Sequence, residues 1–211
     1  MIEANDYAVL NMARAQGRDI CAGSTLNIYN SATLETLAQC GLKRWVPPLE
    51  ATRTLVETLH RSRPQGVETE VFVYGKIPLA FSARCFTARH YDLNKDDCQF
   101  KCLDHAEGLL LKTREGQDFL TINGIQTMSA QNYNLLHEIP DMLAMGIDII
   151  RISPQKEHIG EIIAAFDAAR RGATVSPDRK GWSASGEVDG YWFGTAGIVR
   201  RHPEVIEQAG A

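Results

Sequence analysis

The chain has 211 residues, of which 44% are hydrophobic, 23% charged and 8% aromatic. This composition is typical of a folded domain and excludes a disordered, collagenous or small disulfide-stapled chain. The 22 basic and 26 acidic residues leave a net charge of −4 without a long basic run, which disfavours binding to a nucleic-acid backbone.

Helix and strand patterns alternate along the first 75 residues. Apolar side chains recur at helical spacing in some segments, and short β-branched or apolar runs bounded by glycine or proline mark the strands between them. The predicted elements are a helix over residues 5–16, a strand over 19–22, a helix over 31–40 with Ser31 at its N-cap, a strand over 43–46, a helix over 52–61 and a strand over 68–75. Strands separated by helices predict a parallel sheet with right-handed crossovers.

The same alternation resumes after a cysteine-bearing insert. The predicted elements there are a strand over residues 119–122, a helix over 132–145, a strand over 147–152, a helix over 158–170, a loop over 172–186 and an aromatic run at 191–193 that docks on the body. A complete (β/α)₈ barrel needs about 250 residues and more strands than the roughly five or six counted here. We therefore predict an α/β fold with an incomplete TIM-barrel-like parallel sheet, in a single domain over residues 1–211 with a loop-rich tail over 172–211.

No membrane or export signal is recognisable in the sequence. No stretch approaches the roughly 18 consecutive apolar residues of a membrane helix, and the first residues lack the basic start and apolar run of a signal peptide. These patterns predict a cytoplasmic protein without a transmembrane segment. The five cysteines are an odd number, which in a reducing compartment favours metal binding or buried thiols over a complete disulfide framework.

Three of the cysteines, Cys85, Cys98 and Cys102, lie within one 18-residue insert in the pattern C-x12-C-x3-C. The insert is polar, so it offers a free thiol little apolar surface to pack against. Clustered thiols suit Zn²⁺ or an iron–sulfur cluster, and a zinc site would take His90 or His105 as its fourth ligand. The simpler alternative is three unconnected buried thiols. The insert follows a predicted strand, and in parallel α/β folds the loops at the carboxyl ends of strands build the active site.

Polar residues at predicted strand ends are the other candidates for chemistry. They are Asn27, Glu50, Glu68, Glu70, Asn123, Gln126 and Arg151. Two carboxylates on one strand face, as at positions 68 and 70, can form an acid/base couple, but their place at the start of the strand favours ion pairs with lysine or arginine. The arginine is likewise expected in a salt bridge, and the two amides as loop caps. We assign no catalytic residue from the sequence.

Several blocks of consecutive residues resemble the collagenase-like ("unknown-type") peptidase family. The blocks are residues 68–89, 122–129, 151–155 and 190–192, within a resemblance that runs from near Ala4 to near Gly197. The later blocks narrow it to the branch of the family that acts in anaerobic ubiquinone (coenzyme Q) biosynthesis. The resemblance implies an O₂-independent hydroxylation of a ubiquinone precursor, carried out as a heterodimer with a UbiU-like protein.

The resemblance also implies a [4Fe-4S] cluster held by four cysteines. Three of them match Cys85, Cys98 and Cys102 in order and spacing, and the fourth lies in an N-terminal section of the family that this chain lacks. Together with the missing strands, this predicts a chain that is N-terminally truncated relative to the family. Cys21, in a predicted buried strand, and Cys40, at a predicted helix end, are expected to be structural thiols. Without a replacement ligand the cluster would be labile or absent.

Two other functions stay open, namely a non-catalytic scaffold that stabilises its partner and a collagenase-like peptidase. The second has no support from motifs, since there is no G-x-S-x-G, no H-E-x-x-H and no Ser, His and Asp set of recognisable spacing. A polyprenylated ring precursor is nearly insoluble in water, and the chain shows no basic amphipathic anchor. A lipid-carrying accessory protein is therefore expected as a further partner.

Overall fold

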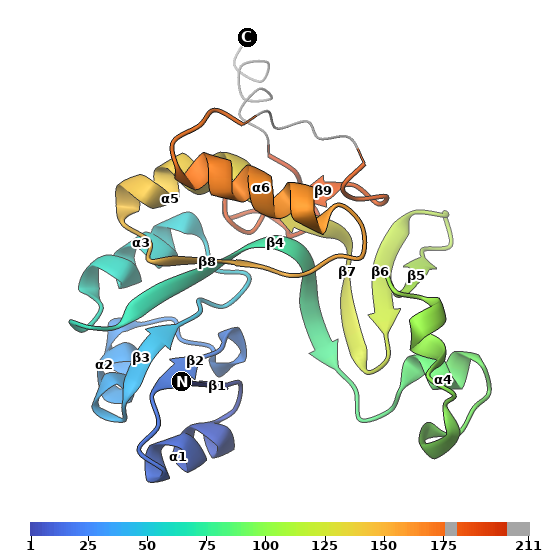
Figure 1. The fold of residues 1–211 in the computed structure, drawn as a ribbon, viewed down its shortest axis with the longest axis horizontal. Coiled ribbons are helices and arrows are strands. Elements are labelled where there is room, and N and C mark those ends of the chain that lie inside the picture. The colour runs from blue at the N-terminus through green and yellow to red at the C-terminus, as the bar shows by residue number, and fades with distance from the viewer. Residues whose placement is uncertain (176–180, 202–211) are drawn as a thin grey trace. The chain divides into compact units, whose positions relative to one another are not determined.

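The chain is described here by a computed structural model that covers residues 1–175 and 181–201 (Figure 1). These residues group into two units. Of the described residues, unit 1 contains 1–73, 137–152 and 189–201, and unit 2 contains 74–136, 153–175 and 181–188. The single domain expected from the sequence stays a prediction, since two such units that share a strand can belong to one folding domain.

Unit 1 contains parallel strands separated by helices. Its strands are β1 (Ile2–Ala4), β2 (Ile20–Ala22), β3 (Leu42–Trp45), the first half of β4 (Glu68–Phe81) and β8 (Ile149–Ile152). Its helices are α1 (Tyr7–Ala15), the 3₁₀ turn η1 (Ser24–Leu26), α2 (Ser31–Gln39), α3 (Arg53–Ser62) and α5 (Ile139–Met145), which follows η4 (Leu136–Glu138). Strands β1, β2, β3 and β4 pair in that order, all parallel, and β8 also pairs with β4. The predicted βα units are therefore confirmed.

The core of unit 1 joins the helices to the strands. Its buried members include Ala4, Leu10, Ile20, Leu34, Leu42 and Trp45, which come from β1, α1, β2, α2 and β3. Side-chain caps fix where the helices begin, as Asp6 does for α1 and Thr52 for α3. The predicted cap Ser31 is wrong by one residue, because Asn30 Oδ1 accepts the Thr33 N–H at 2.8 Å. Asparagine caps a helix at least as well as serine does.

Unit 2 is mainly antiparallel. Its strands are the second half of β4, β5 (Leu109–Lys112), β6 (Asp118–Asn123), β7 (Gln126–Asn134) and β9 (Glu187–Val188). Its helices are α4 (Phe86–His90), η2 (Lys95–Asp97), η3 (Lys101–Asp104) and α6 (Ile159–Arg170). Strand β7 pairs antiparallel with both β4 and β6, β6 with β5, and the short β9 lies parallel to β7. The predicted α/β class with an incomplete barrel-like sheet is confirmed, and the antiparallel half is a finding that the βα pattern did not indicate.

The helix predicted over residues 132–145 is wrong in its first part. Residues 126–134 form β7, which pairs with β4 on one side, and on the other side with β6 at residues 126–129 and with β9 at residues 132–133. The helix α5 begins only at Ile139, with Pro140 in its first turn, where a missing N–H costs no helical hydrogen bond. Sheet pairing therefore overrides the local helical pattern up to Asn134.

The aromatic run near the end of the described chain docks on unit 1, as predicted. Trp192 is 2% exposed, and its Nε1 donates to Glu138 Oε2 at 3.0 Å. Its carbonyl oxygen accepts the Arg53 N–H at 2.9 Å. Residues 176–180 and 202–211 of the predicted tail lie outside the described residues.

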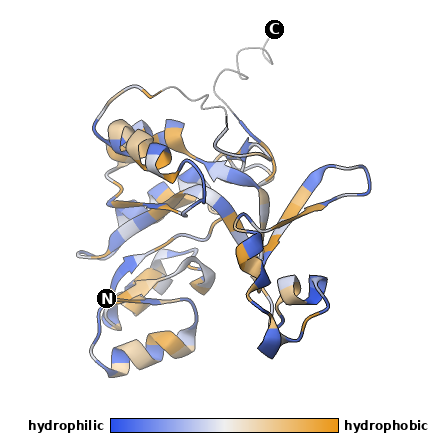
Figure 2. Cartoon of the chain, turned by 45° about the vertical axis from the view of Figure 1, so that its right-hand side comes forward, coloured by the Kyte–Doolittle hydropathy of each residue, from blue (hydrophilic) through white to orange (hydrophobic). Residues whose placement is uncertain are grey.

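Apolar residues are distributed over many short elements. Figure 2 shows hydrophobic and hydrophilic residues interspersed along the helices and strands. Within residues 1–175 and 181–201, no helix has both the length and the apolar character that a membrane crossing requires.

A buried histidine links the core of unit 1 to β4. His60 is 4% exposed, and its Nδ1 lies 2.9 Å from Thr69 Oγ1, which also accepts a hydrogen bond from Trp45 Nε1 at 3.0 Å. Burial lowers the pKa of His60 below its usual value, and the nearby Arg63 lowers it further. The imidazole is therefore held neutral in the folded protein.

This neutral histidine predicts a pH dependence of stability. In the unfolded chain His60 binds a proton below its ordinary pKa of about 6.5, while the folded chain resists protonation there. The free energy of unfolding should therefore fall as the pH drops below about 6.5, and this part of the slope should be lost in His60→Gln. Urea denaturation at several pH values measures the slope. An unchanged slope in His60→Gln would contradict the prediction.

Candidate functional site

The three insert cysteines lie on separate short elements of unit 2. Cys85 precedes α4, and its Sγ accepts the Ala88 N–H at 3.4 Å. Cys98 ends η2, and Cys102 lies within η3. All three thiols are half-buried. The insert follows the antiparallel half of β4, so the expectation that it continues from the carboxyl edge of a parallel sheet is wrong.

The backbone between Cys98 and Cys102 turns through two left-handed residues. Gln99 and Phe100 have φ angles of 51° and 50°, which side-chain-bearing residues seldom adopt. The Lys101 N–H donates to the Cys98 carbonyl at 3.2 Å, which closes this turn. The C-x3-C segment is thus a local turn and not one face of a longer helix.

The two histidines predicted as possible zinc ligands both contact Tyr91. The Tyr91 hydroxyl is hydrogen bonded to His105 Nε2, and the two rings stack with centroids 5.7 Å apart. The ring of His90 meets Tyr91 edge-on at 5.1 Å. Lys101 Nζ lies 5.7 Å from the centre of the Tyr91 ring, and it pairs with Asp104 at 3.2 Å. Tyr91 is therefore the common contact of His90, His105 and Lys101 in the insert.

The residue types of the insert are suitable metal ligands, but their side chains are not close enough together to bind one ion. Three thiols are the ligands that zinc and iron–sulfur clusters take. Within residues 1–175 and 181–201, however, no three His, Cys, Asp or Glu side chains are gathered closely enough to hold a metal ion. The assignment of Cys85, Cys98 and Cys102 as ligands therefore stays a prediction.

An open cavity of about 410 Å³ borders Cys85. Arg84 and Arg89 line it, together with Asp92 and the backbone that leads to Asn94. The volume lies in the range of small-molecule sites. A thiol in the wall of a cavity is reachable by a small reactant.

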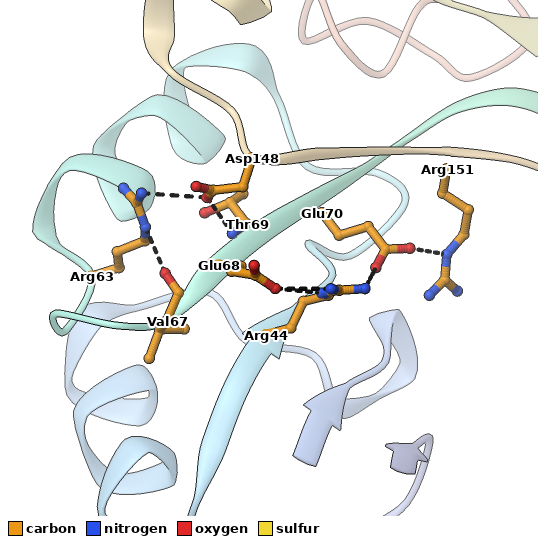
Figure 3. Close-up of polar contacts among 8 residues, drawn as sticks. All are labelled: Arg44, Arg63, Val67, Glu68, Thr69, Glu70, Asp148 and Arg151. Carbon is orange, nitrogen blue, oxygen red and sulfur yellow. Dashed lines mark hydrogen bonds and ion pairs between the residues drawn. The ribbon is translucent and has the colours of Figure 1, made fainter. Parts of the chain in front are cut away.

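A row of ion pairs crosses the parallel strands of unit 1 (Figure 3). Arg44 on β3 pairs with Glu68 at 2.8 Å and with Glu70 at 3.2 Å, both on β4. Arg151 on β8 pairs with Glu70 at 2.5 Å and with Glu3 on β1 at 2.7 Å. The predicted ion pairing of the two β4 carboxylates and of Arg151 is confirmed, and this pairing favours a structural role for the two carboxylates.

The two remaining cysteines lie where the sequence placed them. Cys21 is buried in β2, and its neighbours in the sheet register are Glu3 and Arg44. Burial raises its pKa to about 11, with a further contribution from the carboxylates of Glu3 and Glu70. Cys40 is half-buried at the end of α2. Because the Cys21 thiol holds its proton strongly, Cys21 is a structural group and a poor metal ligand.

The other strand-end residues have local partners. Asn27 ends η1 in a left-handed conformation, and Glu50 accepts a hydrogen bond from the Tyr29 hydroxyl. Asn123 and Gln126 face each other across the turn between β6 and β7. Sequence reasoning missed Glu3 and Arg44 as members of the ion-pair row. Their only sequence signal is alternation within strands of three and four residues.

Comparisons with known proteins identify relatives of this chain. Residues 1–174 match peptidase family U32. The tRNA hydroxylation protein P1 of Bacillus subtilis (strain 168) is 27% identical to the chain over 142 residues, which are 62% of this chain and 32% of that protein. The matched part therefore spans about a third of that relative's length. No solved structure matches the chain.

Proposed function

Because this chain belongs to peptidase family U32, and because one relative is a tRNA hydroxylation protein, we propose that it is an iron–sulfur subunit of a hydroxylation system. The observation that carries the proposal is the set of three half-buried thiols on one insert, at positions 85, 98 and 102. A peptidase lacks comparable support, since the sequence contains no hydrolase motif.

The substrate in this proposal is a ubiquinone-ring precursor, hydroxylated without O₂ under anaerobic conditions. The sequence blocks that resemble the ubiquinone branch support it, and within that branch the chain is similar to UbiV. The net charge of −4 favours an uncharged ring over tRNA, since binding to a polyanion relies on lysine and arginine contacts with phosphates.

Cys85, Cys98 and Cys102 are the proposed ligands of a [4Fe-4S] cluster, with zinc as the alternative metal. Such a cluster supplies one-electron transfer and, where an iron has an open position, Lewis acidity. The protein's own contribution at Cys85 is the Ala88 N–H, which donates to Sγ at 3.4 Å. Hydrogen bonds to a ligating sulfur stabilise its negative charge and tune the potential of a cluster.

The proposed partners are a UbiU-like protein, in a heterodimer, and a lipid-carrying protein that presents the quinone precursor in the cytoplasm. Unit 2 exposes several large apolar side chains at the end of β4, in the turn between β6 and β7 and on the insert, namely Leu79, Phe81, Phe100, Leu103 and Ile125. Exposed apolar side chains in such number are typical of surfaces that another protein covers.

The test is the metal content of the anaerobically purified and reconstituted chain. We expect about four irons and four sulfides per chain, and a loss of most of both in Cys98→Ala. Cys40→Ala is the matched control, because Cys40 is equally half-buried but lies outside the insert. Stoichiometric zinc would show that the site binds zinc and not a cluster. Iron that persists in Cys98→Ala would contradict the ligand assignment.

A second candidate function, a scaffold that only stabilises its partner, is favoured by one observation. The described side chains do not gather three metal ligands. If the wild-type chain binds neither iron nor zinc but still co-purifies with a UbiU-like protein, the scaffold is the function and the iron–sulfur proposal fails.

A further inference from the structure

Unit 2 contains a second cavity, of about 130 Å³, which none of the three insert cysteines lines. Its walls include parts of β4, β7 and residues 181–185, and every lining residue belongs to unit 2. Ala130 and Trp182 supply apolar surface, and Lys76 and Glu107 are among the ionisable residues of the wall. A cavity of about 150 Å³ accepts benzene, so this one has room for a molecule of about five or six heavy atoms.

The amine of Lys76 lies near the part of the wall that Glu107 forms. Lys76 Nζ donates to Thr121 Oγ1 at 2.8 Å. A Cβ atom on Gly108 would lie 2.5 Å from Thr121 Cγ2, so the backbone at Gly108 packs directly against Thr121. Glu107 immediately precedes this glycine and lines the cavity, as Lys76 does. One hydrogen bond leaves the other positions on the lysine nitrogen available to a molecule in the cavity.

Lys76 lacks the ion pair that would hold a half-buried lysine in its charged form. Among the residues that the structure describes, no carboxylate pairs with it. Asp118 pairs instead with Lys112 at 3.2 Å, and Glu107 Oε1 accepts the Lys156 N–H at 2.8 Å. Burial lowers the pKa of Lys76 below its usual value, although the carboxylates of Glu107 and Asp118 act in the opposite direction. A larger fraction of Lys76 than of an exposed lysine is therefore a neutral amine, which is a nucleophile.

We propose that Lys76 is the nucleophile of a carbonyl-binding site, where it forms an imine with a small aldehyde or ketone held in this cavity. Its nitrogen attacks the carbonyl carbon, a C=N bond replaces the C=O bond, and the oxygen leaves as water with the two hydrogens of the amine. The step needs no oxidant or reductant. The carboxyl groups of Glu107 and Glu157 line the same cavity and relay these protons. Ala130 and Trp182 contact the carbon chain of the carbonyl compound.

This inference does not depend on whether the chain binds a cluster, because no residue of the cavity belongs to the segment from Cys85 to Cys102. A lysine desolvated in a pocket is the usual nucleophile of imine-forming sites. The size of the cavity restricts the partner to a short-chain or single-ring carbonyl compound and excludes a polyprenyl chain.

The test uses butanal as the probe on the full chain at neutral pH, with sodium cyanoborohydride to convert the imine into a stable amine. Peptide mass spectrometry measures the rate of butyl addition at each lysine. Lys43 is the internal comparator, because it is exposed and pairs with no carboxylate among the described residues. We expect Lys76 to react at least about fivefold faster than Lys43, since more of it is a neutral amine and the cavity holds the aldehyde beside it.

A larger aldehyde and a cavity variant test whether the reaction takes place in the cavity. Biphenyl-4-carboxaldehyde is too large to enter, so it should react with Lys76 at least about fivefold more slowly than with Lys43. Ala184 is exposed and lines the cavity, so Ala184→Trp should slow butanal addition at Lys76 at least about threefold. Ala83→Trp is the matched control, because Ala83 is also exposed but lies outside this cavity, and it should leave the rate unchanged.

Each other outcome overturns the inference. If Lys76 reacts with butanal no faster than Lys43 does, Lys76 is a structural lysine. If the biphenyl aldehyde keeps the preference for Lys76, the amine is reached from bulk solvent and the cavity selects nothing. An unchanged rate in Ala184→Trp would show that butanal does not enter through the cavity. Circular dichroism checks that the two tryptophan variants fold, and if Ala184→Trp does not, the two wild-type comparisons decide the question.

Discussion

Replacing Gly75 with alanine is expected to lower the free energy of unfolding by about 3–4 kcal/mol. Gly75 has φ +124°, a conformation that residues with a side chain rarely adopt. A Cβ atom at this position would lie 2.5 Å from Ser153 Cβ, well inside van der Waals contact. Backbone strain and overpacking each cost about 1–3 kcal/mol, and both act here.

The control separates the strain from the clash. Gly116 also has a positive φ, of 84°, but a Cβ there would meet nothing within 4 Å. Gly116→Ala should therefore cost only about 1 kcal/mol in urea denaturation. Adding Ser153→Gly to Gly75→Ala should recover part of the loss, because it removes the atom that clashes. Equal losses for Gly75→Ala and Gly116→Ala would show that the close approach to Ser153 has no energetic effect.

Gly75 also explains why the sequence predicted β4 too short. The predicted strand ended at residue 75, and a glycine within a strand often marks a bulge or a close approach of another part of the chain. In the structure β4 continues to Phe81, and its partners change at this point. Glu68 and Thr69 pair with β3, whereas Tyr74 and the residues after it pair with β7. A change of partner strand depends on residues far along the chain, which local patterns do not contain.

The helices α1, α2 and α3 of unit 1 and the strands between them were predictable because each signal is local. Caps such as Asp6 and Thr52 and breakers such as Gly17 lie within a few residues of the helices they delimit. The antiparallel strand β7 was not predictable in this way. The helical pattern that begins at Asn132 competes with sheet pairing to β4 and β9, and a local stretch of sequence contains neither of these partner strands.

The candidate sites were likewise predictable only where their residues lie close together in the sequence. The cysteine insert was recognised because its three thiols lie within 18 residues. For the ion-pair row, the sequence predicted that the β4 carboxylates and Arg151 form ion pairs, but it did not identify their partners. Glu3 and Arg151, for example, are 148 residues apart in the chain. Short strands such as β1 carry too few residues for a recognisable alternation, so Glu3 could not be placed from the sequence.

That ion-pair row carries the second large effect, since Arg151→Met is expected to lower the free energy of unfolding by about 2–3 kcal/mol. The Glu70 side chain is only 7% exposed and is held by Arg151 at 2.5 Å and by Arg44 at 3.2 Å. Removing one arginine leaves a buried carboxylate with a single, longer ion pair, and it also removes the partner of Glu3 at 2.7 Å. The cost stays below that of a fully buried pair because Arg151 is 32% exposed and Arg44 remains.

A double-mutant cycle tests whether the buried charge is the cause. Glu70→Gln removes the negative charge, so Arg151→Met should cost at least about 1 kcal/mol less in a Glu70→Gln background than in the wild type. Arg170→Met is the control for loss of an arginine at the surface, where it pairs with Asp167 and is 56% exposed, and it should change stability by about 0.5 kcal/mol or less. If the costs of Glu70→Gln and Arg151→Met simply add, the two side chains are not coupled. The row would then be a set of solvated charges, and the stability of unit 1 would rest on its apolar core alone.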